Sequence, residues 1–417
     1  MWRNHDLRLI ALLVFVATAL GHFLVFRLAM PKVLGGYYDF AAYYAATQII
    51  KDGSGRDLYN YDTQLTAQQR FSPVRTRPLL YNHPPFEALV FLPFGYFPYS
   101  QAYVLWSLAN LLLLFIIAIL LFPYLSSLWA SLHSGLVVAA FFSFFPIFVA
   151  VLQGQDSVLL LFIYTLLYIA MKQGRELASG VLLAFGAFRP QLILPLLLAF
   201  GFRRRWKVLL GFLSACAVLA FASVEITGWQ GATAYLRLLW TMNQGAREET
   251  TGEDAYFIHP AAMPNLRGFF HAQLAGRIPE PYVTAGILAS SLLLLFWSMR
   301  TGIAQARDAR TDLDLPFALH LTVTVLVSYH LHLHDLSLML LPIVLVANRL
   351  AGEKDFQSRG RLGLASMVVF LFLSPVYMVG VILGRLNLLA LPILVFAVLV
   401  AREISRGGRF MAPPRPE

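Results

Sequence analysis

Residues 176–207 read ELASGVLLAFGAFRPQLILPLLLAFGFRRRWK, and this stretch decides how the chain is threaded. Two apolar runs, about 177–188 and 191–202, are separated by Arg189-Pro190 and followed by the basic run 203–207. If each run is a span, the chain crosses the membrane and returns. If both form one broken helix of about 24 residues, enough for a single crossing, everything downstream is inverted. We expect two spans, because that arrangement keeps the short basic loops on the cytoplasmic side.

The composition indicates a helical membrane protein. The 417 residues are 58% hydrophobic and 13% charged, with a mean hydropathy of +0.66, whereas soluble domains are about 25% charged. Stretches of roughly 18–20 residues with few charges recur, the length that crosses hydrocarbon as a helix. We therefore predict an all-α fold, a polytopic membrane helical bundle. Cys216, the single cysteine, lies in a predicted span, so no intrachain disulfide can form.

The net charge of +10 does not indicate a nucleic-acid partner, because much of the excess lies in short loops between spans, where it sets orientation. The N-terminal apolar run resembles a signal peptide but continues to Phe26, so we interpret it as a retained first helix. We expect a multi-pass protein of the cell inner membrane in contact with membrane lipids. The predicted membrane domain covers residues 1–417.

About 12 transmembrane helices are predicted. Their approximate ranges are 9–27, 100–122, 134–152, 157–171, 177–188, 191–202, 208–227, 282–299, 314–329, 335–349, 362–383 and 386–401. This threading leaves two long extracytoplasmic loops, residues 28–99 and 228–281. In the first loop, Asp39–Gln48 is expected to form a helix capped by Asp39. Residues 84–97, which include Glu87, are expected to form a helix at the interface.

Five polar clusters fall on the extracytoplasmic face in this threading, namely residues 36–40, 81–85, 153–156, 189–191 and 330–335. Asp39 follows Gly35-Gly36 and stands among tyrosines, which suits a carboxylate base beside a bound sugar, although Asp is also a common helix cap. Arg189 suits a phosphate group, or it extends to the outer headgroups. We predict a site that combines both residues.

The run His330-Leu-His332-Leu-His334-Asp335 is the densest ionisable cluster. On a helix His330 and His334 share a face, and on an extended segment all three histidines align. The run suits phosphate, sugar hydroxyls or a metal, but a zinc site lacks a clear cysteine or glutamate partner. Asp335 is equally suited to capping the next span. We therefore assign no metal ligand.

Further binding residues come from the turns at 153–156 and 81–83. Gln153 and Gln155 offer amide groups for sugar hydroxyls, and Asp156 contributes to the site or caps the following span. Tyr81 and His83 precede a rigid Pro-Pro step. The sequence has no Gly-rich phosphate loop, Gly-x-Ser-x-Gly elbow or His-Glu-x-x-His pair, so no cofactor is expected and a divalent metal requirement stays open.

Taken together, these residues resemble the integral-membrane glycosyltransferases of the GT-C class, and in particular the polyprenyl-phosphate-mannose-dependent mannosyltransferase-like family, glycosyltransferase family 87. The resemblance rests on an ordered series of motifs: Asp39-Phe40-x-x-Tyr43-Tyr44, Gly55, Leu58-Tyr59, Tyr81-x-His83-Pro84-Pro85-Phe86, Pro93, Trp106-x-x-x-Asn110, Gly154-Gln155, Arg189-Pro190, residues 203–206 and, more loosely, Asn265-Leu266-Arg267-Gly268 and the histidine run.

The resemblance implies transfer of mannose or a related sugar from a polyprenyl-phosphate donor to a lipid or glycan acceptor on the non-cytoplasmic face. It implies Asp39 as the catalytic base, a histidine among 330, 332 and 334, and inversion at the anomeric carbon. Arg189 and a histidine would stabilise the leaving phosphate. The alternative is a lipid or glycan flippase without transfer activity, against which stands the lack of an inverted repeat. A ligase of diphosphate-linked glycans and a scaffold are weaker alternatives.

Overall fold

The computed structural model describes residues 4–132, 134–245, 260–303, 313–353 and 358–410. Within these ranges the chain folds into helices, with one isolated bridge between Ala275 and Ile278. The all-α prediction is confirmed.

Six of the described helical segments are long and apolar enough to cross a membrane. They are α1 (Asn4–Leu34), α5 (Tyr99–Leu121), α12 (Trp206–Gly245), α14 (Glu280–Ile303), η6 with α16 (His334–Met339 and Leu340–Ala351) and η7 with α19 (Leu386–Leu389 and Ala390–Phe410). Two bent pairs add up to two further spans. They are α7 with α8 (Ser134–Ser143 and Phe145–Gln153) and α17 with α18 (Arg359–Phe372 and Ser374–Ile382).

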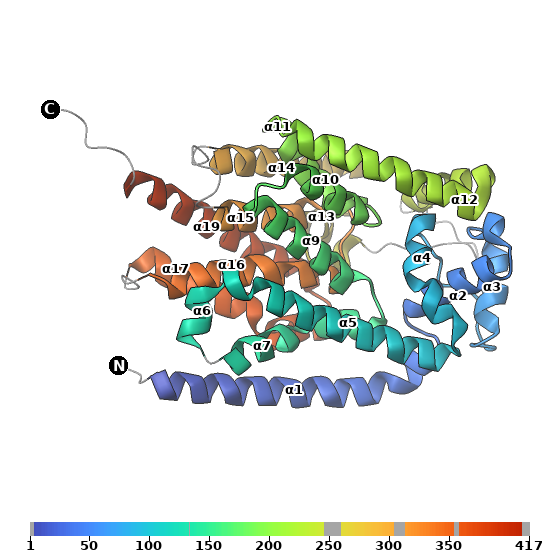
Figure 1. Cartoon of the computed structure of the whole chain (residues 1–417), viewed down its shortest axis with the longest axis horizontal. Coiled ribbons are helices and arrows are strands. Elements are labelled where there is room, and N and C mark those ends of the chain that lie inside the picture. Colours follow the sequence, from blue (N-terminus) through green and yellow to red (C-terminus); the bar gives the residue numbers. More distant parts are fainter. Residues whose placement is uncertain (1–3, 133, 246–259, 304–312, 354–357, 411–417) are drawn as a thin grey trace.

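Four shorter apolar helices correspond to the remaining predicted spans, namely α9 (Ser157–Lys172), α10 (Glu176–Phe185), α11 (Pro190–Phe202) and α15 (Asp314–Val327). Every predicted span therefore falls on a helix, but the count of 12 crossings is not confirmed. The helix α15 is buried from Leu315 to Leu326, whereas none of the apolar window of α1 is buried. The shorter helices thus include the centre of the bundle, and α1 lies at its edge (Figure 1).

The helices α10 and α11 form a hairpin rather than one broken helix. Arg205, just beyond the end of α11, forms an ion pair with Glu176 at the start of α10. These two helix ends therefore lie together, and the connecting turn with Arg189 lies at the other end. The interpretation of residues 176–207 as two runs of opposite direction is correct.

Glycines bring α10 and α12 into close contact. A Cβ atom on Gly180 would lie 2.0 Å from the carbonyl oxygen of Val208, and one on Gly211 would lie 2.2 Å from that of Leu177. Small residues let helix backbones approach in this way, and membrane helices use them often because lipid offers no hydrophobic driving force.

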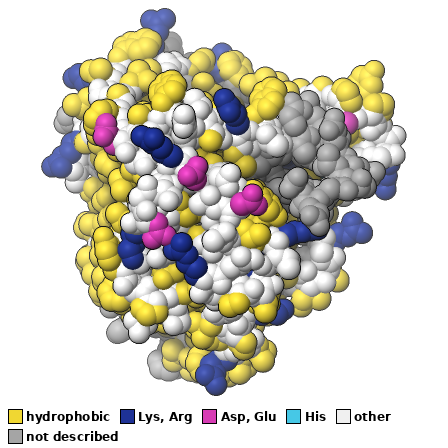
Figure 2. Space-filling view, turned by 90° about the vertical axis from the view of Figure 1, so that its right-hand side faces the viewer, with side chains coloured by type: hydrophobic (Ala, Val, Ile, Leu, Met, Phe, Trp, Pro, Cys, Tyr) yellow, Lys and Arg dark blue, Asp and Glu magenta, His cyan; other side chains and the backbone are white. Residues whose placement is uncertain are grey.

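The first long loop forms a cap on one end of the bundle. It contains α2 (Phe40–Lys51), η1 (Gly55–Asp57), α3 (Tyr61–Gln69), η2 (Pro85–Glu87), α4 (Ala88–Phe91) and η3 (Leu92–Tyr96). Figure 1 shows the labelled helices α2, α3 and α4 at the right, opposite both termini. Aromatic side chains fill the cap, with Tyr43 stacked on Phe91 at 4.3 Å between ring centroids. Figure 2 looks at this end and shows Lys, Arg, Asp and Glu side chains dispersed over it.

Residues 228–281, predicted as the second long loop, contain more helix than expected. Gly228 has φ 65° and bends α12, which then continues to Gly245. After residues 246–259, which lie outside the described ranges, η5 (Pro260–Ala262) and α13 (Leu266–Leu274) follow. Two small elements, η4 (Phe122–Tyr124) and α6 (Ser126–Ser131), complete the described chain.

Candidate active site

Asp39 stands at the start of α2, but its carboxylate does not cap that helix. Gly36, with φ 76°, turns the chain after α1, and Asp39 occupies the N-cap position with helical dihedrals and no side-chain capping bond. Instead its Oδ2 atom accepts a hydrogen bond from Nε2 of Gln155 at 2.5 Å. The Asp39 carboxylate therefore does not stabilise the start of α2, and it contacts a residue that is distant in the sequence.

Gln155 joins the cap to the bundle because of the turn that precedes it. Gly154 ends α8 in the left-handed conformation, with φ 66°. A Cβ atom on Gly154 would lie 2.6 Å from Cβ of Phe40, so only glycine lets α2 approach this closely. The Oε1 atom of Gln155 accepts hydrogen bonds from the Tyr43 hydroxyl at 3.0 Å and from Nη2 of Arg189 at 2.7 Å. One amide group therefore connects the Asp39 carboxylate to the Arg189 guanidinium.

Arg189 is buried and does not extend to the headgroups. Its Nη2 atom lies 2.6 Å from Oδ1 of Asp156, and Nε donates to the same carboxylate. Its Nη1 atom lies 3.8 Å from Asp335. Burial alone would raise the pKa of Asp156, but Arg189 and His83 outweigh it and hold that pKa below its usual range. Arg189 is thus a charged group held inside the protein by two carboxylates.

The histidine run is neither one helix nor one strand. Residues 328–333 are irregular and His334 begins η6. The ring centroids of His330 and His332 are 4.5 Å apart, and those of His332 and His334 are 5.4 Å apart. The Nδ1 atom of His334 is 2.8 Å from Oε1 of Gln153. All three rings therefore gather at one place, although neither the helical nor the extended alternative describes the run.

A cavity of about 70 Å³ lies where these residues meet. Seven of the predicted site residues line it, namely Asp39, His83, Gln155, Arg189, His330, His332 and His334. Ligand pockets typically measure about 300–1,000 Å³, so the cavity is small for a ligand site.

The other four predicted site residues lie outside the lining. Tyr81 is fully buried, and its hydroxyl donates to the carbonyl oxygen of Pro84. Asp335 is also fully buried and accepts a hydrogen bond from the backbone of His332. Asp156 holds Arg189, and Gln153 contacts His334. These four residues lie outside the cavity and pack against or bond to the residues that line it or their neighbours.

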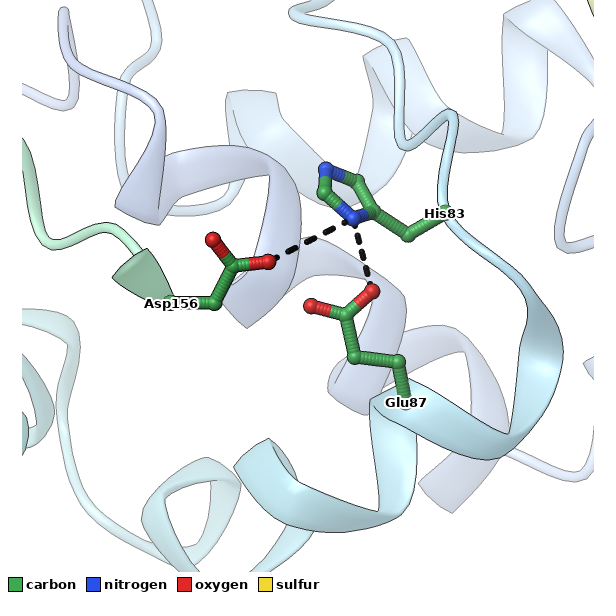
Figure 3. Close-up of side chains that lie close together, drawn as sticks. All are labelled: His83, Glu87 and Asp156. Atoms are coloured by element: carbon green, nitrogen blue, oxygen red, sulfur yellow. Dashed lines mark ion pairs between the residues drawn. The ribbon is translucent and has the colours of Figure 1, made fainter. Parts of the chain in front are cut away.

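Two ionisable residues near the site were not predicted as site residues. Glu87, in η2, is fully buried and lies 2.7 Å from Nδ1 of His83 through its Oε2 atom (Figure 3). Arg267, in α13, stacks over the ring of Tyr329 at 3.9 Å and donates to its carbonyl oxygen. The spacing of His83 and Glu87, four residues apart in an apolar segment, is the signal that could have identified Glu87.

Burial shifts the pKa values of the ionisable groups at the cavity. It raises the pKa of Asp39, although the Gln155 hydrogen bond, His332 and Arg189 all act in the opposite direction. Desolvation outweighs these three neighbours, because burial penalises the charged form of the carboxylate. Burial lowers the pKa of His83 and of His330 to about 3 each, so these imidazoles are neutral near pH 7.

Helices of membrane-spanning length, together with a buried carboxylate, guanidinium and imidazole group at one end of the bundle, define a polytopic membrane enzyme. The model of glycosyltransferase family 87 matches residues 81–329, which is more than half of the chain. The chain belongs to this family and is a membrane glycosyltransferase. Asp39 and the histidine run lie outside the matched residues. No curated protein and no solved structure matches the chain.

Proposed function

We propose that the protein transfers mannose or a related monosaccharide from a polyprenyl-phosphate donor to a lipid or glycan acceptor at the non-cytoplasmic face of the inner membrane. The observation that carries this proposal is the bridge through Gln155, which holds the Asp39 carboxylate and the Arg189 guanidinium at one cavity. A glycosyl transfer from a phosphate needs a base for the acceptor and a cation for the leaving group, and this cavity offers both.

Asp39 acts as the general base. It takes the proton from the acceptor hydroxyl while that oxygen forms a bond to the anomeric carbon. The bond from the anomeric carbon to the phosphate oxygen breaks on the opposite face, which inverts the configuration. A carboxylate with a raised pKa holds the proton better than an exposed aspartate does, which favours proton transfer in the transition state.

The departing polyprenyl phosphate gains one negative charge as the bond breaks. Arg189 is the permanent cation at the cavity, and the imidazole N–H groups of His330, His332 and His334 are neighbouring donors. Fixed donors of this kind stabilise charge that develops in the transition state. Asp156 occupies one edge of the guanidinium and Asp335 lies 3.8 Å from Nη1, so these two carboxylates hold Arg189 in place at the cavity.

A second cavity supports a lipid-linked donor. It measures about 420 Å³ and lies between α1, α5, α7 and α8, with an apolar lining that includes Phe23, Met30 and Phe148. Tyr103, also in its lining, donates to the carbonyl oxygens of Val151 and Leu152, just before the turn that carries Gln155. A prenyl chain placed there would have its phosphate near the site.

The test is a transfer assay with purified protein, radiolabelled polyprenyl-phosphate-mannose and a membrane lipid extract as the source of acceptor. We expect a labelled, more polar product, no product from GDP-mannose, and far less product from the Asp39→Asn variant. Reconstituted liposomes in which labelled donor crosses the bilayer without forming a product would instead establish the flippase alternative.

A further inference from the structure

Three potential metal ligands from two segments of the chain meet beneath the cavity. They are Nδ1 of His83, a carboxylate oxygen of Glu87 in η2, and one of Asp156 at the start of α9, all within 4.8 Å of one another. Figure 3 shows both carboxylates directed at the same imidazole nitrogen. The distances from Nδ1 are 2.7 Å to Glu87 and 3.7 Å to Asp156. The two carboxylates are fully buried.

Hydrogen bonding on the other side of the imidazole shows which nitrogen carries the proton. The Tyr43 hydroxyl has one hydrogen, which it donates to Gln155, and it lies 3.2 Å from Nε2 of His83. With that hydrogen directed at Gln155, Nε2 is the donor to Tyr43, and a neutral His83 then has a bare Nδ1. A bare Nδ1 beside carboxylate oxygens brings lone pairs together, an arrangement that a proton or a bound cation between them relieves.

No protein side chain in the described part of the chain supplies that cation. The described residues supply no conventional donor to Nδ1 of His83 or to the oxygens of Glu87, whose close polar contacts are with each other and with Asp156. No Lys or Arg there forms an ion pair with Glu87, and Arg189 is engaged by Asp156. Leaving buried polar atoms unpartnered is costly.

We propose that His83, Glu87 and Asp156 bind one divalent metal ion, Mn²⁺ or Zn²⁺, beneath the catalytic cavity. One imidazole and two carboxylates suit these ions better than Ca²⁺ or Mg²⁺, which prefer all-oxygen sites. Neighbouring ligand atoms at about 2.1 Å from one ion are roughly 3.0–3.4 Å apart, so Glu87, at 2.7 Å from Nδ1, would move slightly outward and Asp156, at 3.7 Å, slightly inward. This assignment departs from the expectation of a site without metal ligands.

The metal would position the base through its ligand. Metal-bound histidines normally donate their other N–H group, which fixes the tautomer and the ring orientation. Here that N–H meets Tyr43, Tyr43 donates to Gln155, and Gln155 donates to Asp39. His83 and Tyr43 are thus positioning residues for Asp39, connected to it by a continuous chain of hydrogen bonds.

The test uses the full-length protein and no sugar donor, so its failure would be distinct from failure of the proposed function. After chelation and dialysis, Mn²⁺ is titrated into the protein and free Mn²⁺ is followed by electron paramagnetic resonance, with Zn²⁺ added as a competitor. We expect one ion per chain and a raised Tm on binding.

Glu87→Gln keeps the size of the side chain but removes the ligand charge, and it should weaken Mn²⁺ binding at least about tenfold. The matched control is Glu403→Gln, another buried carboxylate, which pairs with Arg361 in α17, and this variant should bind as the wild type does. Wild-type protein that binds neither ion and shows no change in Tm would overturn the proposal. In that case the Glu87 side chain carries a proton and donates it to Nδ1 of His83, in place of the metal ion.

Discussion

At the scale of single residues, Asp39 illustrates how one side chain is released for chemistry. Its sequence context favours a helix cap, and it does stand at the N-cap of α2, yet its only described side-chain hydrogen bond is to Gln155. Identifying Asp39 as the base rests on where Gln155 and Arg189 lie, which no local pattern specifies.

Replacing Asp39 with Asn should abolish most transfer. Asparagine has the same size and is an equally good N-cap residue, so α2 should form, but it cannot take a proton. We expect kcat to fall about 10²–10⁴-fold with Tm unchanged, measured with the labelled donor. Asp62→Asn, an exposed change in α3 of the same cap, is the control. Near-normal transfer by Asp39→Asn would end the base assignment.

Replacing Gln155 with Leu should alter the pH dependence. The Gln155 hydrogen bond favours the ionised form of Asp39, so its loss raises the pKa of Asp39 further. Because the base works only when ionised, activity is lost as pH falls through this pKa. The acid limb of the kcat/KM profile should therefore move to higher pH. Gln153→Leu, which contacts His334 and not Asp39, should leave that limb in place, and equal displacement in both variants would contradict the assignment.

At the scale of elements, the lengths of the apolar runs, and the prolines and charged residues between them, located the helices. Packing decided which helices are in contact. The break at Arg189-Pro190 could be predicted from the sequence, because proline is favoured at the first position of a helix and disrupts a helix interior. The close approach of α10 and α12 was not readable, because a glycine in a membrane helix is common and only the facing backbone gives Gly180 its role.

The two substitutions Gly180→Ala and Gly201→Ala should have opposite effects. A methyl group on Gly180 would meet the carbonyl oxygen of Val208, whereas one on Gly201 would meet nothing within 4 Å. We expect Gly180→Ala to lower stability by about 1–3 kcal/mol, seen as a lower Tm in detergent. Gly201→Ala should be neutral or slightly stabilising, because alanine favours helix. Similar Tm values for the two variants would show that α10 and α12 are not in close contact.

At the scale of the whole molecule, the cap of residues 35–97 lies at one end of the bundle, and both described ends of the chain lie at the other end (Figure 1). The basic run 203–207 lies at the end away from Arg189, as the ion pair of Arg205 with Glu176 requires. If basic loops stay in the cytoplasm, the cavity opens on the other side of the membrane.

Labelling of single cysteines tests this orientation. In a Cys216→Ser background, Arg70→Cys in the exposed cap should react with a membrane-impermeant maleimide applied to right-side-out vesicles. Lys207→Cys should react only after the vesicles are permeabilised. Reaction of Lys207→Cys in sealed vesicles would invert the protein and place the site on the cytoplasmic side.

The sequence by itself determined the class of the protein, because membrane burial needs long apolar helices and these are visible as composition and spacing. It also identified seven of the residues that line the cavity. Only the tertiary structure decided which side chains line that cavity and which support it, as for Tyr81 and Asp156. It alone showed that Glu87 faces His83 and Asp156. The reason is physical: an ionisable group acquires its protonation state and its partner from burial and from neighbours on other helices, and neither is encoded in its own local sequence.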